Sequence, residues 1–332
     1  MGERAWSVMS IRSQHACRSG VLSIVDSGGS AHAGGSGRVG GVSSHPSEVK
    51  QGAPEVEVRL EVGGEALDLV LRSLRTQDDY EQCESLESAT WGQRYVVPAS
   101  LVTVTQKIGG VSAGAFDPEG RMVGLVFGLT GWRDGRRVHW SHMLAVTEEM
   151  RGCGVGRELK LFQRQVVEAQ GISTILWTYD PLVARNAHLN INRLGARPVE
   201  YLEDFYGPGS DSDLHRGLGT DRFVVEWPLA GTPAVMGVDP SGWGSVPSAN
   251  TDVAGAPLSG DFEVVATERA RVEIPADIQR AKLIAEDVGR HWRFCTRRAL
   301  KEYFSLGYRV VGFDRGRASG RCFYLLRQTE TR

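Results

Sequence analysis

The sequence predicts an α/β protein, of the α+β kind, with a mixed, mostly antiparallel central sheet and flanking helices. Residues 110–116 and 122–129 are predicted to form two antiparallel strands joined by the turn at 117–120. Residues 138–146 alternate as a further strand, followed by a glycine-rich turn and a helix. A short strand is predicted at 174–178. The sequence therefore predicts an antiparallel meander that is followed along the chain by a strand-helix-strand unit.

Size and composition exclude several classes of protein. The chain has 332 residues, enough for one or two domains with a substantial core. A net charge of −2 argues against a global nucleic-acid or membrane surface. The five cysteines are scattered without a CxxC pair, which predicts a reducing compartment and no structural zinc. Because no apolar run approaches about 18 residues, we expect no membrane span and a cytoplasmic protein.

Composition divides the chain into four parts. Residues 1–55 are rich in glycine and serine and are expected to be a disordered tail. Residues 56–229 carry the sheet, and 230–260 have the composition of a linker. Residues 261–332 form an α/β extension that is too small for confident independence, so we expect it to pack on the preceding domain or a neighbouring subunit.

The elements before the meander are less regular. Residues 67–71 predict the first strand, and Thr76 to Asp79 resemble a helix-start box with Tyr80, Cys83 and Leu86 on one face of the helix. Trp91 and Tyr95 are candidates for ligand contact or for core packing. Pro98 is compatible with a helix start, but the β-branched residues at 101–104 leave helix and strand both open.

The later elements follow the same rules. A second helix is expected to end at 194–196, and two strands at 196–201 and 223–227. In the extension we predict strands near 262–266 and 272–275, then a helix and a hairpin. Its strands are 309–313 and 322–326. The helix has an apolar face of Val288, Trp292, Cys295, Ala299, Tyr303 and Leu306, and a basic stripe of Arg290, Arg293, Arg297 and Lys301.

The turn at 151–156 is the most informative stretch. The helix after it has one apolar stripe of Val155, Leu159, Phe162, Val166 and Ala169. Unpaired N–H groups and the helix dipole make such a turn a phosphate site. A dinucleotide fingerprint would need glycine at Leu159 or Arg157, and no Walker lysine follows, so both of those sites are excluded.

Arg151, Gly154 and Gly156 match the Arg/Gln-x-x-Gly-x-Gly/Ala motif, and the chain resembles the GNAT superfamily of acyltransferases over roughly residues 56–227. The sequence of residues 177–182, together with Leu194, Gly195 and Ala196, resembles an uncharacterised bacterial branch of this superfamily, here with a C-terminal extension. The resemblance implies the GNAT fold, acetyl-CoA or another acyl-CoA as co-substrate, and no metal.

The resemblance also implies which residues bind coenzyme A. The pyrophosphate would meet the turn and the pantetheine arm would pair with the open edge of strand 138–146. Arg151 is favoured as a phosphate contact; for Arg157 and Lys160 a solvated helix face is equally plausible. The candidate set is Leu144, Ala145, Val146, Arg151, Gly152, Cys153, Gly154, Val155, Gly156, Arg157, Asn186 and Asn190.

Direct transfer needs a base and a proton for the departing thiolate. His142 leads as base because it precedes Leu144 by two residues on the same predicted face, while His139 points the other way. A hydrogen-bonded strand histidine is the alternative. Main-chain N–H near Leu144 would stabilise the oxyanion.

The sequence departs from the family at the thiol. Ile191 stands where the family usually has a tyrosine, and Ala184 where it usually has asparagine. Ile191 cannot donate a proton. Solvent or a neighbour must then do so, and the candidates are Tyr179, His188 and Asn190.

Charged residues outside the turn have open roles. Asp180 would bind the acceptor ammonium or cap a helix, and Asp221 with Arg222 would close the site or form a loop ion pair. The basic stripe is read as a solvated face, with coenzyme A phosphate or nucleic acid as alternatives.

The expected function is N-acyl transfer, most simply N-acetyl transfer, from acyl-CoA to the amine of a small molecule. Arg185 or Arg193 would suit a succinyl donor. The alternative is a non-catalytic acyl-CoA sensor. We expect neither nucleic acid nor a membrane as partner, and a homodimer is left open.

Overall fold

The computed structural model describes residues 54–62, 64–207, 218–230, 240–284, 286–316 and 320–329. The predicted N-terminal tail lies outside these residues, apart from its last two. None of the described helices is long and apolar enough to cross a membrane.

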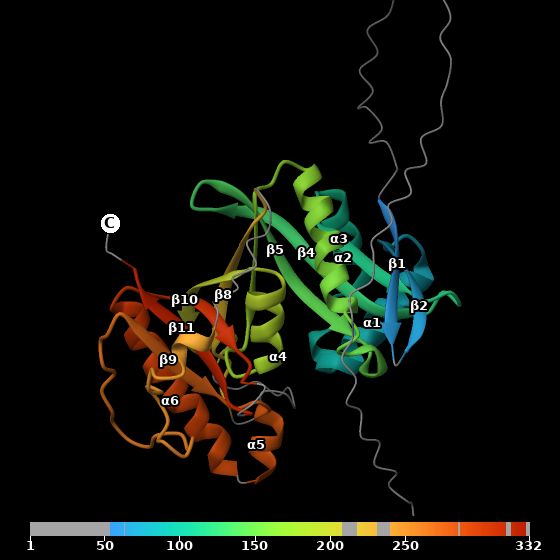
Figure 1. Cartoon of the computed structure of the whole chain (residues 1–332). Coiled ribbons are helices and arrows are strands. Elements are labelled where there is room, and N and C mark those ends of the chain that lie inside the picture. The colour runs from blue at the N-terminus through green and yellow to red at the C-terminus, as the bar shows by residue number, and fades with distance from the viewer. Residues whose placement is uncertain are drawn as a thin grey trace, which may run out of the picture.

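The larger sheet has eight strands in the described part of the chain, in the order β1-β2-β3-β4-β5-β6-β8-β7 (Figure 1). Neighbouring strands are antiparallel except β5 and β6, which are parallel. The strands are β1 (Glu55–Val62), β2 (Glu65–Ser73), β3 (Val111–Phe116), β4 (Met122–Arg133), β5 (Arg136–Val146), β6 (Thr174–Tyr179), β7 (Arg197–Leu202) and β8 (Arg222–Pro228).

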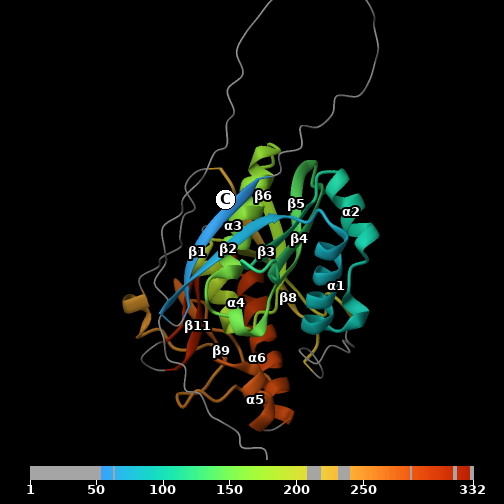
Figure 2. The same cartoon turned by 90° about the vertical axis from the view of Figure 1, so that its right-hand side faces the viewer.

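Helices lie on both faces of this sheet (Figure 2). The helix α3 covers one face and packs against β3, β4 and β5, while α1 and α2 cover the other. The bounds are α1 (Gln77–Trp91), η1 (Gln93–Tyr95), α2 (Ala99–Lys107), η2 (Glu148–Met150), α3 (Val155–Ala169), α4 (Ala184–Ala187) and the π-helix η3 (His188–Arg193).

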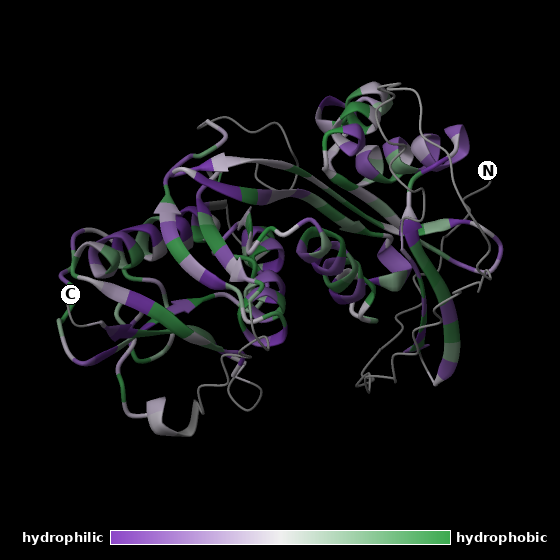
Figure 3. Cartoon of the chain, turned by 90° about the horizontal axis from the view of Figure 1, so that it is seen from above, coloured by the Kyte–Doolittle hydropathy of each residue, from purple (hydrophilic) through white to green (hydrophobic). Residues whose placement is uncertain are grey.

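A second sheet of three strands, in the order β10-β11-β9, lies beyond β7 and β8, with α6 against it and α5 beside α6. Seen from above, this C-terminal part lies at the opposite end of the molecule from α1 and α2 (Figure 3). Its elements are η4 (Pro240–Trp243), β9 (Arg269–Ile274), α5 (Ile278–Ile284), α6 (Glu286–Ser305), β10 (Tyr308–Asp314) and β11 (Cys322–Gln328).

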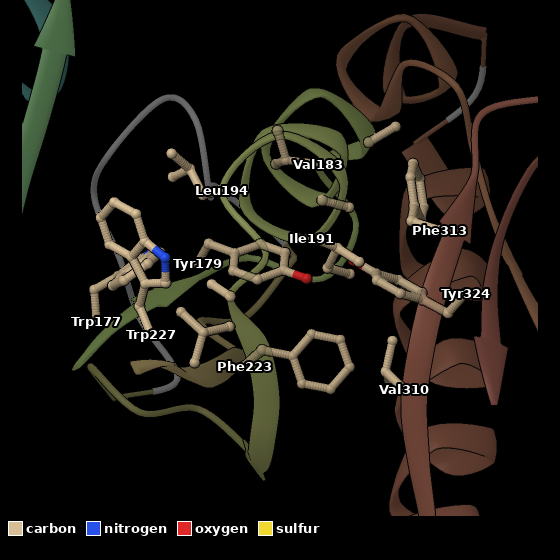
Figure 4. Packing of buried hydrophobic residues seen from close by; sticks show 14 of the residues in the cluster. Trp177, Tyr179, Val183, Ile191, Leu194, Phe223, Trp227, Val310, Phe313 and Tyr324 are labelled. Carbon is tan, nitrogen blue, oxygen red and sulfur yellow. The ribbon is translucent and has the colours of Figure 1, made fainter. Parts of the chain in front are cut away.

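The two sheets share one hydrophobic core. Tyr179 and Phe223 of the larger sheet meet Tyr324 of β11, with Phe223 and Tyr324 ring centroids 5.3 Å apart (Figure 4). Tyr324 also donates to the Pro181 carbonyl at 2.7 Å. The extension thus packs on the preceding domain, as expected, whereas the division of the chain into domains stays a prediction.

Most predicted elements are confirmed. The helix-start box of α1 forms, since Thr76 Oγ1 accepts from the Asp79 N–H at 3.1 Å and Asp79 accepts from the Thr76 N–H at 3.0 Å. The segment 101–104 is helical, within α2. On its far face Leu101, Val104 and Ile108 are exposed, so its β-branched residues do not mark a buried strand.

Two predictions are wrong. The first strand is β1, whose alternating Val56, Val58 and Leu60 the prediction overlooked. No strand forms near 262–266, where Phe262 and Val264 pack against the core outside the described sheets. One edge of β9 pairs with β11, and the other is bridged by Ser248 at Arg271, which leaves 262–266 no strand edge of β9 to join.

Candidate active site

The two parallel strands pair only briefly. His139 pairs with Ile175 and Trp140 with Leu176, and beyond these residues β5 and β6 diverge. The β5 edge from Ser141 to Val146 therefore has no partner strand on the β6 side in the described structure. We call this opening the fork. Its free N–H and C=O groups suit a ligand that hydrogen-bonds as a strand does.

A β-bulge interrupts β5 inside the fork. Phe127 of β4 pairs with Met143 and Gly128 pairs with Ser141, so His142 is the extra residue on β5. A bulge shifts side chains to the other face of the sheet. Ser141 accordingly faces α3, whereas Met143 lies in the cluster beneath α1 and α2.

The bulge corrects the prediction for His142. Its ring meets Phe127 edge-on, with centroids 6.1 Å apart, on the α1 and α2 side, whereas Leu144 packs on the α3 side. The two residues therefore do not share a face. His142 is exposed, yet crowding by neighbouring atoms still lowers the pKa of its imidazole. It is suited to accept a proton near neutral pH.

The glycine-rich turn ends beside the fork. Gly154 is the N-cap of α3 with φ of 101°, which an L side chain rarely adopts, and it provides no side-chain cap. The first N–H groups of α3 have no acceptor within the helix. A Cβ placed on Gly156 would lie 3.6 Å from Val146 Cγ2 and 3.7 Å from Leu144 Cδ2, so the turn and the end of β5 are adjacent.

The strand order, the parallel pair that opens into a fork and the glycine turn leading into α3 define the architecture. Residues 55–228 have the GNAT fold. The predicted resemblance is thereby confirmed at the level of the fold. The fold places Leu144, Val146 and the turn 151–156 together, as the prediction for coenzyme A requires, whereas Ala145 faces the α1 and α2 side.

Solved structures with this fold align with about half of the chain. One is the NatC complex bound to Gag peptide and CoA, with a TM-score of 0.39, 16% identity, and 48% of this chain and 98% of that chain covered. Another is the ribosomal-protein-S18-alanine N-acetyltransferase from Escherichia coli, with a TM-score of 0.39, 16% identity and coverages of 49% and 96%.

A third similar structure is an aminoglycoside 6'-N-acetyltransferase complexed with coenzyme A, with a TM-score of 0.37, 15% identity and coverages of 49% and 98%. No family model matches the chain. No curated protein matches it.

The cationic side chains near the glycine-rich turn 151–156 differ in how far they are available to a ligand. Arg151 is exposed and bends back, with Nε 3.4 Å from the Val146 carbonyl. Arg157 pairs with Glu158 at 2.6 Å. Lys160 does not face the turn at all, because its side chain is 2% exposed and points into the fork. Its burial therefore fits neither of the two roles considered for it, a phosphate contact or a solvated helix face.

The candidates for thiol protonation lie in different places. Tyr179 is 5% exposed in the core between the two sheets, and burial raises the pKa of its hydroxyl (Figure 4). Asn190 accepts from Trp177 Nε1 at 3.3 Å, and His188 Nδ1 lies 3.1 Å from Asn192. Asn186 is half-buried on α4. Ile191 is fully buried.

The basic stripe of α6 is a solvated face only in part, because Arg290 and Lys301 are exposed whereas Arg293 and Arg297 make internal contacts. Arg293 is 4% exposed and donates to Asp180 at 2.7 Å. Arg297 donates to Asp221 at 2.6 Å. Asp180 also accepts from the Leu182 N–H at 2.9 Å, which is the local capping role we considered. Asp221 forms an ion pair with Arg297.

Other features of the described chain lie elsewhere. Two shallow hollows follow α6 and β7, beside Glu203, Lys301 and Val199, away from the fork. Among the residues described, no group of three His, Cys, Asp or Glu side chains could hold a metal ion.

Proposed function

We propose that this protein transfers an acyl group, most simply acetyl, from acyl-CoA to a primary amine of a small molecule. The observation that carries this proposal is the unpaired β5 edge, which leads from the fork to the uncapped start of α3. Coenzyme A has a pyrophosphate for the helix start and two amides for the strand edge. Arg151 and Arg157 are the proposed phosphate contacts from side chains.

The transfer is direct. The amine enters from the α1 and α2 side and attacks the thioester carbon, while main-chain N–H near Leu144 stabilises the oxyanion. His142 faces that side and takes the amine proton. The C–S bond then breaks, and its electron pair leaves with sulfur.

A second function is a sensor that binds acyl-CoA without transferring the group. Ile191 favours it, because a fully buried isoleucine stands where the family usually has a proton donor. For a succinyl donor, Arg185 and Arg193 are the available cations of α4 and η3, and both are exposed.

Calorimetric titration with acetyl-CoA and succinyl-CoA tests the proposal. We expect Gly154→Glu to abolish binding, because it puts a carboxylate where the pyrophosphate would lie. Gly135→Glu is the matched control, since Gly135 also has positive φ, at 72°, but lies in the β4–β5 turn with open space around it. The control should bind as the wild type does.

Thiol release is then measured with the preferred donor and a panel of amino acids and polyamines. Amine-dependent release from the wild type and its loss in His142→Ala support the transferase. Binding without release from any amine identifies a sensor. Absence of binding to either donor refutes both functions.

A further inference from the structure

One amine is buried inside the fork. Lys160 of α3 is 2% exposed, and its Nζ donates to Ser141 Oγ at 2.7 Å and lies 3.8 Å from the centre of the Trp177 ring. Within the described ranges no carboxylate lies at ion-pair distance from it. An amine buried without a counter-ion is costly, so such a group is generally retained for a reason.

Its position coincides with the apex of the fork. Trp140 and Leu176 form the last pair of β5 and β6. Ser141 and Trp177 are the next residue on each strand, and Lys160 contacts both. The amine therefore lies where the strands separate, on the α3 side of the sheet.

The reach of coenzyme A matches this position. From its pyrophosphate to its sulfur the arm has about thirteen chain atoms, the length of roughly four extended residues. An arm anchored at the start of α3 and laid along β5 from Val146 brings the sulfur to the level of His142 and Ser141. The hydroxyl of Ser141 is then the nearest side-chain donor on the α3 face.

We propose that Lys160, acting through the Ser141 hydroxyl, supplies the proton that the departing coenzyme A sulfur takes up. This inference rests on the proposed acyl transfer. The amine nitrogen forms its bond to the acyl carbon, the C–S pair becomes the thiolate, Ser141 O–H gives its proton to sulfur, and the Lys160 ammonium restores the serine proton. The proton lost by the new amide returns through the base and solvent, so no net charge accumulates.

The surroundings of Lys160 favour this role. Its burial lowers the pKa of the ammonium well below the usual value, which makes it a stronger acid. His139 faces it from β5, with Gln163 between them, and is itself held neutral. Trp177 from β6 carries no charge, and Arg157 on α3 is paired with Glu158.

The sequence had left the proton source open. Ile191 has no proton to give, and the Tyr179 hydroxyl lies in the core between the sheets rather than beside β5. In our proposal Lys160, on the inner face of α3, supplies the sulfur's proton from the α3 side of the fork.

The test compares wild type with Lys160→Met and Ser141→Ala, and uses Leu159→Met as a control for repacking beneath α3. Leu159 is fully buried and adjacent in sequence. Two readouts are taken: the pH at which the thiol of bound coenzyme A ionises, followed by thiolate absorbance, and kcat against pH with saturating donor.

We expect the thiol of bound coenzyme A to ionise at least one pH unit lower in wild type than in Lys160→Met, because a nearby ammonium favours the thiolate. We expect kcat to fall about 100-fold in both variants with KM for the donor within about 3-fold, and the alkaline limb of the profile to disappear in Lys160→Met. The control should match wild type.

Unchanged thiol ionisation in Lys160→Met overturns the inference, whether or not the protein turns over. An unchanged kcat profile in an active protein overturns it as well. A shifted thiol ionisation without any turnover would support the coupling of Lys160 to the sulfur through Ser141 and refute the proposed transfer, so the two failures are distinguishable.

Discussion

Acid should destabilise this protein through His139. The side chain is fully buried, with Nε2 3.1 Å from Gln163 Nε2 and Nδ1 3.2 Å from Thr130 Oγ1. The neutral ring accepts from the Gln163 amide and donates to Thr130. A second proton on Nε2 would face the amide donor. Burial, and then the charge of Lys160, lower the pKa of the imidazole to about 3.

The direction and size of this destabilisation follow from the difference in proton binding between the folded and unfolded chain. Below pH 6.5 the unfolded chain binds a proton at His139 that the folded chain refuses, so the free energy of unfolding falls as pH falls and levels off near pH 3. One pH unit is worth about 1.4 kcal/mol. Between pH 7 and pH 5 the loss is therefore about 2 kcal/mol, and by pH 3 about 4 kcal/mol.

Urea unfolding followed by tryptophan fluorescence at pH 7 and pH 5 measures this loss. His139→Gln has no proton to gain, so its stability should change between the two pH values by about 2 kcal/mol less than that of the wild type. Exposed His291→Gln is the control and should behave as the wild type does. If His139→Gln loses as much stability as the wild type, the reasoning is refuted.

Three further outcomes are expected in urea unfolding at pH 7. Arg293→Met should destabilise the protein by about 3–5 kcal/mol, because it leaves the buried Asp180 carboxylate without its main partner. Arg290→Met, the control, removes an exposed ion pair and should change stability by less than about 1 kcal/mol. Equal effects of the two substitutions would contradict this prediction. Leu159→Ala should cost about 2–5 kcal/mol, since Leu159 is fully buried, and a neutral result would mean that α3 does not pack as described. Trp132→Ser, at a side chain 76% exposed, should stay within about 0.5 kcal/mol, and a larger loss would indicate a contact outside the described residues.

Periodicity predicted α3, which buries one face, whereas β3 and the first part of β4 are buried on both faces and were marked by the turn between them. Val155 and Leu159 mark the stripe of α3 that packs on the sheet. Pattern was less decisive for α2, whose β-branched Val102 is buried while Val104 is exposed. Elements that a local sequence rule determines, such as the start of α1 at Thr76, were predicted correctly. The strand predicted at 262–266 does not form, because strand formation there depends on pairing with β9, which a local pattern does not reveal.

The candidate site was predictable where it depends on main chain and less so where it depends on side-chain direction. The turn at Gly154 and the end of β5 could be placed together from the motif. The face of His142 could not, because a bulge is set by pairing with β4 and leaves no reliable mark in one sequence. For Lys160 the sequence left a phosphate contact and a solvated face both open, although its position four residues after Gly156, on the inner face of α3, was a usable signal of burial.

The ion pairs that join α6 to the larger sheet affect the order in which the chain can be assembled on the ribosome. Asp180 is made 113 residues before Arg293, and Asp221 is made 76 residues before Arg297. Until α6 emerges, the end of β6 and the start of β8 have their carboxylates without these guanidinium partners. Translation that stops before α6 should therefore yield a nascent chain whose sheet is incompletely formed, exposed to proteases and chaperones, even though every strand of the larger sheet has already been synthesised.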